Sequence, residues 1–242
     1  DKGGSRGGAS RASSVTSNQF SNEPSKYGAM TDDPRRMLEN AVVRLLKSRP
    51  FYGHLRLGLN RRMATGRHPL GVTIINGTPT LCIDPDRFST FGPVEQQALL
   101  EHGIKHLLHL HPLRGRGQHR LTWDIACDLA INAFIEGMPA EAPAPEQFGL
   151  EAGLAAEEYA RLVAPRFDLG SLEGEGVGTA DRQAGGRPHE DAAMSAPLDD
   201  HAVWSEADST PERLAEQALR DLVREAHRKV HGEVPDDVRD LV

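Results

Sequence analysis

Four histidines lie close together in one apolar stretch of the chain, the sequence LLEHGIKHLLHLHPLRG at 99–115. His102 and His106 are four residues apart, so on an α-helix both imidazoles project from one face and can share a metal ion. His109 lies on that face too, but about 10.5 Å from His102 along the helix axis. We therefore expect His102 and His106 to be metal ligands and His109 to line the core or support them.

Gly103, the residue after His102, stands where hydrolytic chemistry would need a base. In zinc peptidases with two histidines at this spacing, a glutamate directly after the first histidine activates water. The inverted form of the motif, with a glutamate directly before the second histidine, is absent as well, because Lys105 occupies that position. Loss of a positioned general base typically lowers the rate by about 10² to 10⁴. The sequence therefore predicts a metal site without an identifiable catalytic residue.

A second apolar stretch, LTWDIACDLAINAFIEG, is expected to form a helix closed by Gly137 and to supply a third ligand. Its polar residues recur every four positions and form one stripe, namely Asp124, Asp128, Asn132 and Glu136. Asp128 is the preferred ligand, because a lone carboxylate among apolar neighbours needs a cation or strong hydrogen bonds. Two alternatives stay open: His111, if the first helix unwinds before Pro112, and His201 in the segment DDHAVW.

The sequence patterns around these residues predict the helices and strands that position them, and together these elements predict an α+β domain that is mostly helical. Helices are expected to begin at Asp33-Pro34 and at Gly92-Pro93, because each pair combines a cap with a first-turn proline. The run LGVTIINGTPTLCIDPDRF predicts a β-hairpin that turns at Asn76-Gly77. Pro79 cannot donate to a ladder, so its strand should lie at a sheet edge. The histidine helix is apolar on nearly every side, which predicts that it is buried.

One domain is expected over residues 32–242. Residues 1–31 are rich in Gly, Ser and Arg and lack hydrophobic periodicity, so we expect a disordered tail or a cloning linker there. Residues 170–205 are Gly-rich and acidic without a period, which predicts a flexible insert. Beyond it, the stretch from Ser209 to Gly232 has apolar residues at fourfold spacing and predicts an amphipathic helix.

Composition excludes several classes of function. The 242 residues carry a net charge of −7 and no basic stripe, so nucleic-acid binding is not expected. No run of about 18 apolar residues is present, so no membrane span is expected. The first residues also lack the apolar core of a secretion signal. Cys82 and Cys127 lie in apolar segments and are expected to be buried, reduced thiols of a cytoplasmic protein.

Four segments, taken in order, resemble one bacterial protein family: RPFYGHLRLGL, TIINGTPTLCIDPDRF, LLEHGIKHLLHLHPLRG and WDIACDLAIN. The family is the metallopeptidase-type domain found N-terminal to von Willebrand factor A-like domains, with a helix of the form HExxHxxxxHPLR followed by WxIAxDxxIN. The matching residues are His102, His106, His111, Pro112, Leu113, Arg114, Trp123, Asp128 and Asn132. Gly103 departs from the pattern, because it replaces the glutamate.

The resemblance implies a zincin-like α+β fold in which a β-hairpin packs on the active-site helix and offers an edge to an extended peptide. It also implies one bound zinc ion, for which His102, His106 and Asp128 are the expected ligands. Because genes of the resembled family lie near genes for MoxR-type AAA+ ATPases, the resemblance also implies such an ATPase as a partner, together with a von Willebrand A-type domain.

Three functions follow as alternatives. With Gly103 in place of the glutamate, the favoured one is a zinc-binding, catalytically impaired domain, a pseudoenzyme that binds a peptide or protein partner. The alternative is an active metal-dependent peptidase with a non-standard general base, for which Asp124 or Glu136 would have to approach the metal. The third is a helical scaffold whose histidines bind no metal.

Overall fold

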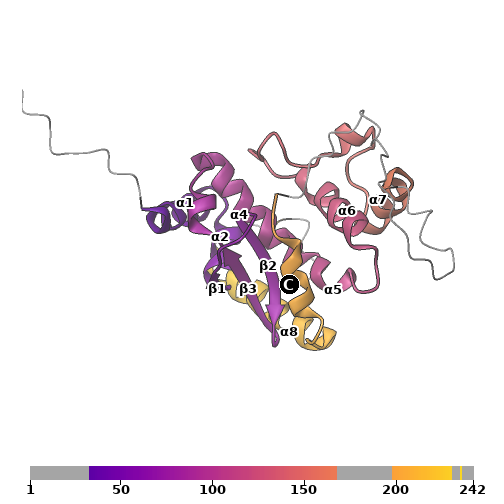
Figure 1. The fold of residues 1–242 in the computed structure, drawn as a ribbon. Coiled ribbons are helices and arrows are strands. Elements are labelled where there is room, and N and C mark those ends of the chain that lie inside the picture. The colour runs from indigo at the N-terminus through magenta and orange to yellow at the C-terminus, as the bar shows by residue number, and fades with distance from the viewer. Residues whose placement is uncertain (1–32, 168–197, 231–234, 236–242) are drawn as a thin grey trace, which may run out of the picture. The chain divides into compact units, whose positions relative to one another are not determined.

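The computed structural model describes residues 33–167, 198–230 and 235, which fold into helices around a small sheet (Figure 1). The elements are, in chain order, α1 (Pro34–Ser48), α2 (Pro50–Gly58), β1 (Asn60–Met63), β2 (Leu70–Ile75), β3 (Thr78–Ile83), α3 (Pro85–Phe88), α4 (Pro93–Leu108), α5 (His111–Arg114), α6 (Arg120–Asn132), η1 (Pro145–Phe148), α7 (Ala156–Val163), η2 (Ala164–Phe167), η3 (His201–Ala207) and α8 (Glu212–Lys229). This is the predicted fold class, α+β and mostly helical. The predicted tail at 1–31 and the part of the predicted insert at 170–197 lie outside the described residues.

The predicted hairpin forms the antiparallel pair β2–β3. Its register runs from Leu70 opposite Ile83 to Ile75 opposite Thr78. Asn76 and Gly77 have positive φ angles of 50° and 78°, as a two-residue hairpin turn of the favoured type requires. The local sequence signal at this turn was therefore sufficient to predict the hairpin.

The prediction that the strand of Pro79 lies at the sheet edge is wrong. The strand order is β1-β3-β2, so β3 is central, and β1 pairs with it in parallel from Asn60 opposite Thr80 onward. Because hydrogen-bonded and non-hydrogen-bonded pairs alternate in an antiparallel ladder, the backbone nitrogen of Pro79 points away from β2 and toward β1. Because the pairing with β1 begins one residue later, the missing N–H of Pro79 costs no ladder hydrogen bond.

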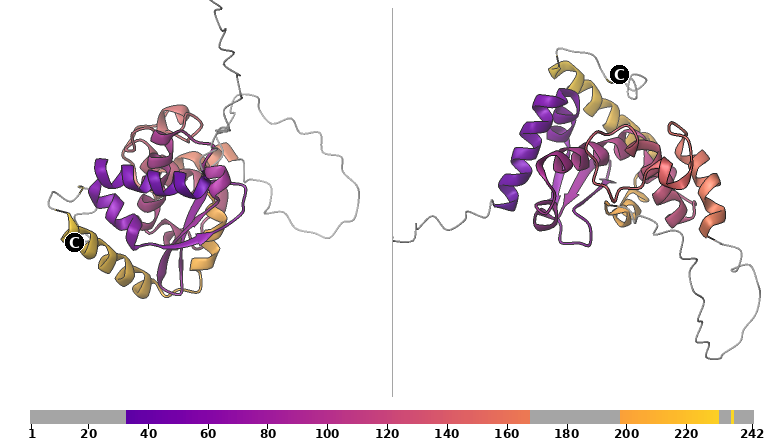
Figure 2. Two further views of the ribbon diagram at one scale, coloured as in Figure 1. Left: turned by 90° about the vertical axis from the view of Figure 1, so that its left-hand side faces the viewer. Right: turned by 90° about the horizontal axis from the view of Figure 1, so that it is seen from above.

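The histidine helix α4 is the central helix of the main core, which also contains the sheet and parts of α1, α2 and α8. Every residue of α4 from Ala98 to Leu108 is buried, as predicted. In the ribbon views α4 lies between α1 and the pair α6–α7 (Figures 1 and 2). One face of α4 can therefore contact the sheet while another faces α6.

The second predicted helix, α6, packs on α7 in a separate apolar cluster that includes Ile125, Leu129 and Tyr159. It ends at Asn132 rather than near Gly137, because the chain turns there and the Ile135 N–H bonds to the Asn132 carbonyl. Glu136 consequently lies outside the helix and its side chain is exposed. The structure thus removes Glu136 as a replacement base.

The long C-terminal helix α8 is amphipathic, as predicted, and buries Ala215, Leu219, Val223 and Ala226. No helix within 33–167 or 198–230 is long and apolar enough to cross a membrane. Cys82 and Cys127 are free and buried, which confirms their predicted burial. Burial raises the pKa of both thiols, so both are protonated at neutral pH.

Candidate metal centre

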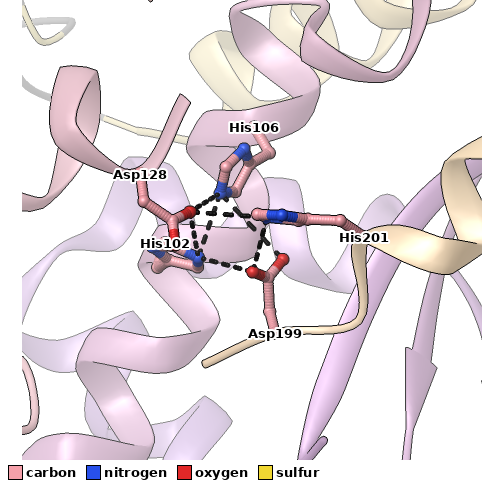
Figure 3. A group of neighbouring side chains, drawn as sticks. All are labelled: His102, His106, Asp128, Asp199 and His201. Carbon is pink, nitrogen blue, oxygen red and sulfur yellow. Dashed lines mark hydrogen bonds and ion pairs between the residues drawn. The ribbon is translucent and has the colours of Figure 1, made fainter. Parts of the chain in front are cut away.

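Five side chains from three parts of the chain meet at one buried point (Figure 3). α4 supplies His102 and His106, and α6 supplies Asp128. Asp199 lies two residues before η3, and His201 is the first residue of η3. Each offers one nitrogen or oxygen atom, and these five atoms lie within 4.8 Å of one another. None of the five residues is more than 4% exposed. The fold therefore assembles a compact set of metal-ligating atoms away from solvent.

Short contacts between imidazole nitrogens and carboxylate oxygens define the cluster. His106 Nε2 lies 3.0 Å from His102 Nε2 and 3.2 Å from Asp128 Oδ1. His201 Nε2 lies 2.6 Å from Asp199 Oδ1 and 3.4 Å from Asp128 Oδ1. His102 Nε2 is also 3.3 Å from Asp199 Oδ1. All three histidines thus direct Nε2 toward the same small volume, as Figure 3 shows.

The outer nitrogen of each histidine lies against a different partner. His102 Nδ1 lies 2.7 Å from Asn132 Oδ1, and the Asn132 amide nitrogen donates in turn to the Pro143 carbonyl. Because an amide oxygen can only accept, His102 carries its proton on Nδ1 and leaves Nε2 free to coordinate.

The other two histidines are held by α5 and α6. His106 Nδ1 lies 2.9 Å from His111 Nδ1, so one of these nitrogens donates a hydrogen bond to the other. His201 Nδ1 lies 3.6 Å from Asp124 Oδ1, within ion-pair distance. Partners of this kind fix ring orientation in metal sites. Here they are Asn132 for His102, His111 for His106 and Asp124 for His201.

The electrostatics of the cluster favour neutral His106 and ionised carboxylates. Burial, together with the neighbouring His102, lowers the pKa of His106 to about 4, so its imidazole is neutral at neutral pH. Burial also opposes charge on His201, but the Asp199 and Asp128 carboxylates outweigh it and raise the pKa of His201. Burial opposes ionisation of Asp199 in the same way, yet the charge on His201 keeps the pKa of that carboxyl low.

The donor set fits a metal ion better than it fits a hydrogen-bond network. Among the described residues, the carboxylate oxygens of Asp128 and Asp199 and the ring nitrogens of His201 have ion-pair contacts, the shortest at 2.6 Å, but none with hydrogen-bond geometry. Buried charges held only in this way are costly, and one divalent cation at the centre would take up the facing carboxylate oxygens and the Nε2 atoms. Imidazole and carboxylate are ligands that zinc and related divalent ions accept. The residues present can therefore hold one such ion.

The three predicted ligands, His102, His106 and Asp128, all belong to this cluster. His201, an alternative to Asp128 in the sequence, lies beside Asp128 rather than in its place. Asp199 was missed, because it falls in the stretch assigned to a flexible insert and has no periodic context. Its one sequence signal is the Asp-x-His spacing to His201, which the segment DDHAVW contains.

His111 and His109 lie outside the cluster. Leu110 adopts a left-handed conformation with φ of 56°, so the helix does unwind before Pro112. The His111 ring nevertheless packs behind His106 and contacts its outer nitrogen. His109 stacks on His111 with ring centroids 5.4 Å apart. His111 therefore lies directly behind a cluster histidine, and His109 contacts His111 rather than the cluster.

Replacement of Asn132 by alanine tests the support of His102. Without the amide oxygen, the His102 ring loses the partner that fixes its tautomer, and metal affinity is expected to fall about 10- to 100-fold. Competition against a chromophoric chelator measures this change. Asn132→Asp, which keeps an acceptor at the same atom, is expected to retain most of the affinity. Equal affinity in wild type and Asn132→Ala would contradict the assigned role.

Gly103 faces the sheet rather than an open cleft. A Cβ atom built on Gly103 would lie 3.0 Å from Val72 Cγ1 and 3.3 Å from Leu70 Cδ1, both on β2. The next nearest atom, Leu81 Cδ1 on β3, is 4.0 Å away. Glycine at this position therefore allows α4 to approach the sheet closely, and a longer side chain would enter the apolar core.

Residues 198–210, here called the covering segment, lie along β2, the strand at one edge of the sheet. The Asp200 N–H donates to the Leu70 carbonyl at 2.7 Å, and the Thr210 hydroxyl donates to the Ile74 carbonyl at 3.1 Å. The covering segment therefore occupies part of the hairpin edge that was expected to be available to an extended peptide. Residues 198–205, which the predicted insert included, are folded, because they carry Asp199 and His201 of the cluster and most of η3.

Gly71 is the point of closest approach between β2 and the covering segment. A Cβ atom there would lie 2.6 Å from the Asp200 carbonyl oxygen, so Gly71→Ala is expected to push the segment outward. Displacement of Asp199 and His201 should lower metal affinity at least about 10-fold and stability by about 1–3 kcal/mol. Chelator competition and urea unfolding measure the two effects.

Gly66→Ala is the matched control, because the nearest atom to its Cβ would be 3.9 Å away, an ordinary contact. Its metal affinity and stability should equal those of wild type. If Gly71→Ala also leaves metal affinity unchanged, the covering segment does not contribute ligands.

The fold and the cluster together define an α+β domain with a buried His/Asp group able to bind a metal ion. Residues 34–242 match the protein family described as "Putative metallopeptidase domain", and the chain belongs to that family. Comparison with curated proteins and with solved structures gives no match.

Proposed function

We propose that this chain is a zinc-binding member of its family that does not hydrolyse peptides efficiently and instead binds a peptide or protein partner. The observation that carries the proposal is the combination of a complete ligand cluster with Gly103 packed against β2. The candidate ligands are present, while a Cβ atom at the position of the motif glutamate would already be crowded by Val72 and Leu70 of the sheet.

The ligand arrangement favours a closed metal site. His102, His106, Asp128, Asp199 and His201 would hold the ion, and structural zinc sites are typically filled by protein ligands, whereas catalytic sites keep a position open. A bound divalent ion would supply Lewis acidity that polarises a carbonyl group. With all five ligands buried, such chemistry would require at least one of them to leave.

The partner role rests on different support. A cavity of about 350 Å³ adjoins the centre at His201 and Asp124, which favours binding of a small group beside the metal. The proposed partnership with a MoxR-type AAA+ ATPase and a von Willebrand A-type domain rests on the family resemblance of the sequence. Co-purification of the chain with a MoxR-type ATPase from the same organism would test that part.

Peptide hydrolysis by the metal-loaded protein is the decisive assay. Wild type is expected to cleave quenched fluorescent peptides no faster than His106→Ala, which lacks a central ligand. Hydrolysis that is well above this background, and that disappears in His106→Ala, would overturn the proposal.

A second candidate function, an active metal-dependent peptidase with a non-standard base, is favoured by one observation. His201 lies beside the cavity with Asp124 at 3.6 Å from its outer nitrogen, an arrangement that can accept and hold a proton. Asp124→Asn separates the two functions, because it should abolish any hydrolysis under this second candidate while metal content stays the same.

A further inference from the structure

A second cavity lies between α2, α4, α6 and the loop before α7, and it measures about 700 Å³. The lining residues from α6 and from that loop are apolar or small, and Ile131 and Leu154 are among them. The lining residues from the α1–α2 junction and from α4 are mostly charged, and Arg49 and Lys105 are among them. A chain segment with both apolar and acidic side chains would therefore match this cavity, here called the α4–α6 pocket.

Pro235 is the lining residue that comes from the C-terminal end of the sequence, and it is partly exposed. Helix α8 ends at Lys229, and the next residue, Val230, packs against the main core. Consecutive Cα atoms are about 3.8 Å apart, so the Cα atoms of Asp236 and Asp237 lie within about 8 Å of that of Pro235. Covalent geometry therefore brings these two aspartates to the pocket or its rim.

The charges of the pocket and of the C-terminal residues are complementary. Arg49, Lys105 and Arg114 are lining cations, and Glu101 is the one lining anion. Arg49 Nε lies 3.8 Å from Glu101 Oε2, and Arg114 donates to Glu157, outside the lining, at 2.6 Å. The lining thus keeps an excess of one positive charge. Residues 235–242, PDDVRDLV, carry three aspartates and one arginine, a net charge of −2.

Lys105 is the centre of this excess. Its side chain is buried, with 5% of the residue exposed, and its ammonium lies 5.2 Å from the centroid of the Tyr52 ring. A buried ammonium is costly unless an anion accompanies it, and a ring face offsets only part of that cost. Lys105, Tyr52, Glu101 and His109 all have interaction partners, as an occupied pocket requires.

We infer that residues 235–242 of this chain dock in the α4–α6 pocket, where Asp236 or Asp237 pairs with Lys105. Only five residues connect Pro235 to Val230 in the core, so the docking is intramolecular. A short connection of this kind gives an effective concentration on the order of mM, so weak contacts suffice.

The inference goes beyond the proposed function, because it concerns a second surface and requires no bound metal. It gives the pocket an occupant from within the chain. A partner peptide that used the same pocket would have to be acidic and to displace residues 235–242.

Hydrogen–deuterium exchange of the full chain, followed by mass spectrometry, measures the docking. The amides of residues 236–242 are expected to exchange at least about 10-fold more slowly than those of a synthetic peptide with the same sequence. Exchange at the rate of the synthetic peptide would overturn the inference.

Two variants test the pairing of charges. Asp236→Asn/Asp237→Asn removes both carboxylates next to Pro235 and leaves the pocket unchanged, whereas Lys105→Met removes the ammonium and keeps an unbranched side chain. Each should speed exchange of residues 236–242 at least about 5-fold, as loss of a charged contact implies. Asp221→Asn, at an exposed site on α8, is the matched control and should exchange like wild type.

The aspartate double variant keeps the test valid if Lys105→Met fails to fold. Unchanged protection in Asp236→Asn/Asp237→Asn would contradict the pairing. Zinc content measured on the same samples reports the metal cluster separately, so failure of the docking and failure of the proposed function are distinguishable.

A labelled PDDVRDLV peptide distinguishes the chain's own segment from an external partner. In fluorescence anisotropy the peptide should bind Asp236→Asn/Asp237→Asn at least about 5-fold more tightly than wild type, because the released segment no longer competes. Equal binding to the two proteins would mean that the pocket is open to an external acidic peptide and would overturn the inference.

Discussion

Replacement of Gly103 by glutamate is expected to destabilise the domain strongly rather than to create a peptidase. From the sequence alone, Gly103 marks the position of a lost catalytic glutamate. A glutamate side chain would, however, crowd the sheet, because Val72 Cγ1 lies 3.0 Å from the Cβ position. Overpacking and burial of an unpaired charge together should lower the free energy of unfolding by at least about 3 kcal/mol. Urea unfolding of the purified variant, followed by circular dichroism, measures this loss.

Gly103→Ala is the control for this experiment. Alanine is favoured over glycine by about 1 kcal/mol in a helix, while the close contact with Val72 opposes that gain. The alanine variant is therefore expected to lie within about 1 kcal/mol of wild type. A Gly103→Glu variant that folds as well as Gly103→Ala, or that hydrolyses peptides, would show that position 103 faces the site after all.

Asp128→Asn is expected to lower stability far more with metal than without it. In chelator the loss is limited to the ion pairs of Asp128, whose Oδ1 lies 3.2 Å from His106 Nε2 and 3.4 Å from His201 Nε2. With zinc, the variant should bind at least about 100-fold more weakly. Wild type should gain about 2.7 kcal/mol when free zinc exceeds the dissociation constant 100-fold, and the variant should gain little.

Thermal unfolding in chelator and in buffered zinc measures both differences. Asp221→Asn, at an exposed site on α8, should respond to zinc as wild type does. If Asp128→Asn is destabilised equally under the two conditions, the cluster is a network of ion pairs rather than a metal site.

Much of the candidate centre could be predicted from local sequence. The spacing of His102 and His106 needs only the period of an α-helix, and Asp128 stands out as a carboxylate inside an apolar helix. Asp199 could not be found in this way, because its position depends on where a non-periodic segment crosses the sheet edge. The contact between Gly71 and Asp200 likewise decides whether the edge of β2 is open to an extended peptide.

The fold shows the same division between local and long-range information. The Asn76-Gly77 turn was predictable, since its backbone angles depend on those two residues. The central place of β3 was not, because it depends on where the distant strand β1 begins to pair. The role of Gly103 likewise depends on a helix–sheet distance that no motif encodes.

The metal content of the purified full chain tests the central claim most directly. Elemental analysis is expected to find about one equivalent of zinc per chain, lost in a His102→Ala/His106→Ala double variant, and a chelator should lower the melting temperature of wild type. Less than about a tenth of an equivalent of any divalent metal after loading, with melting unchanged by chelator, would contradict the account.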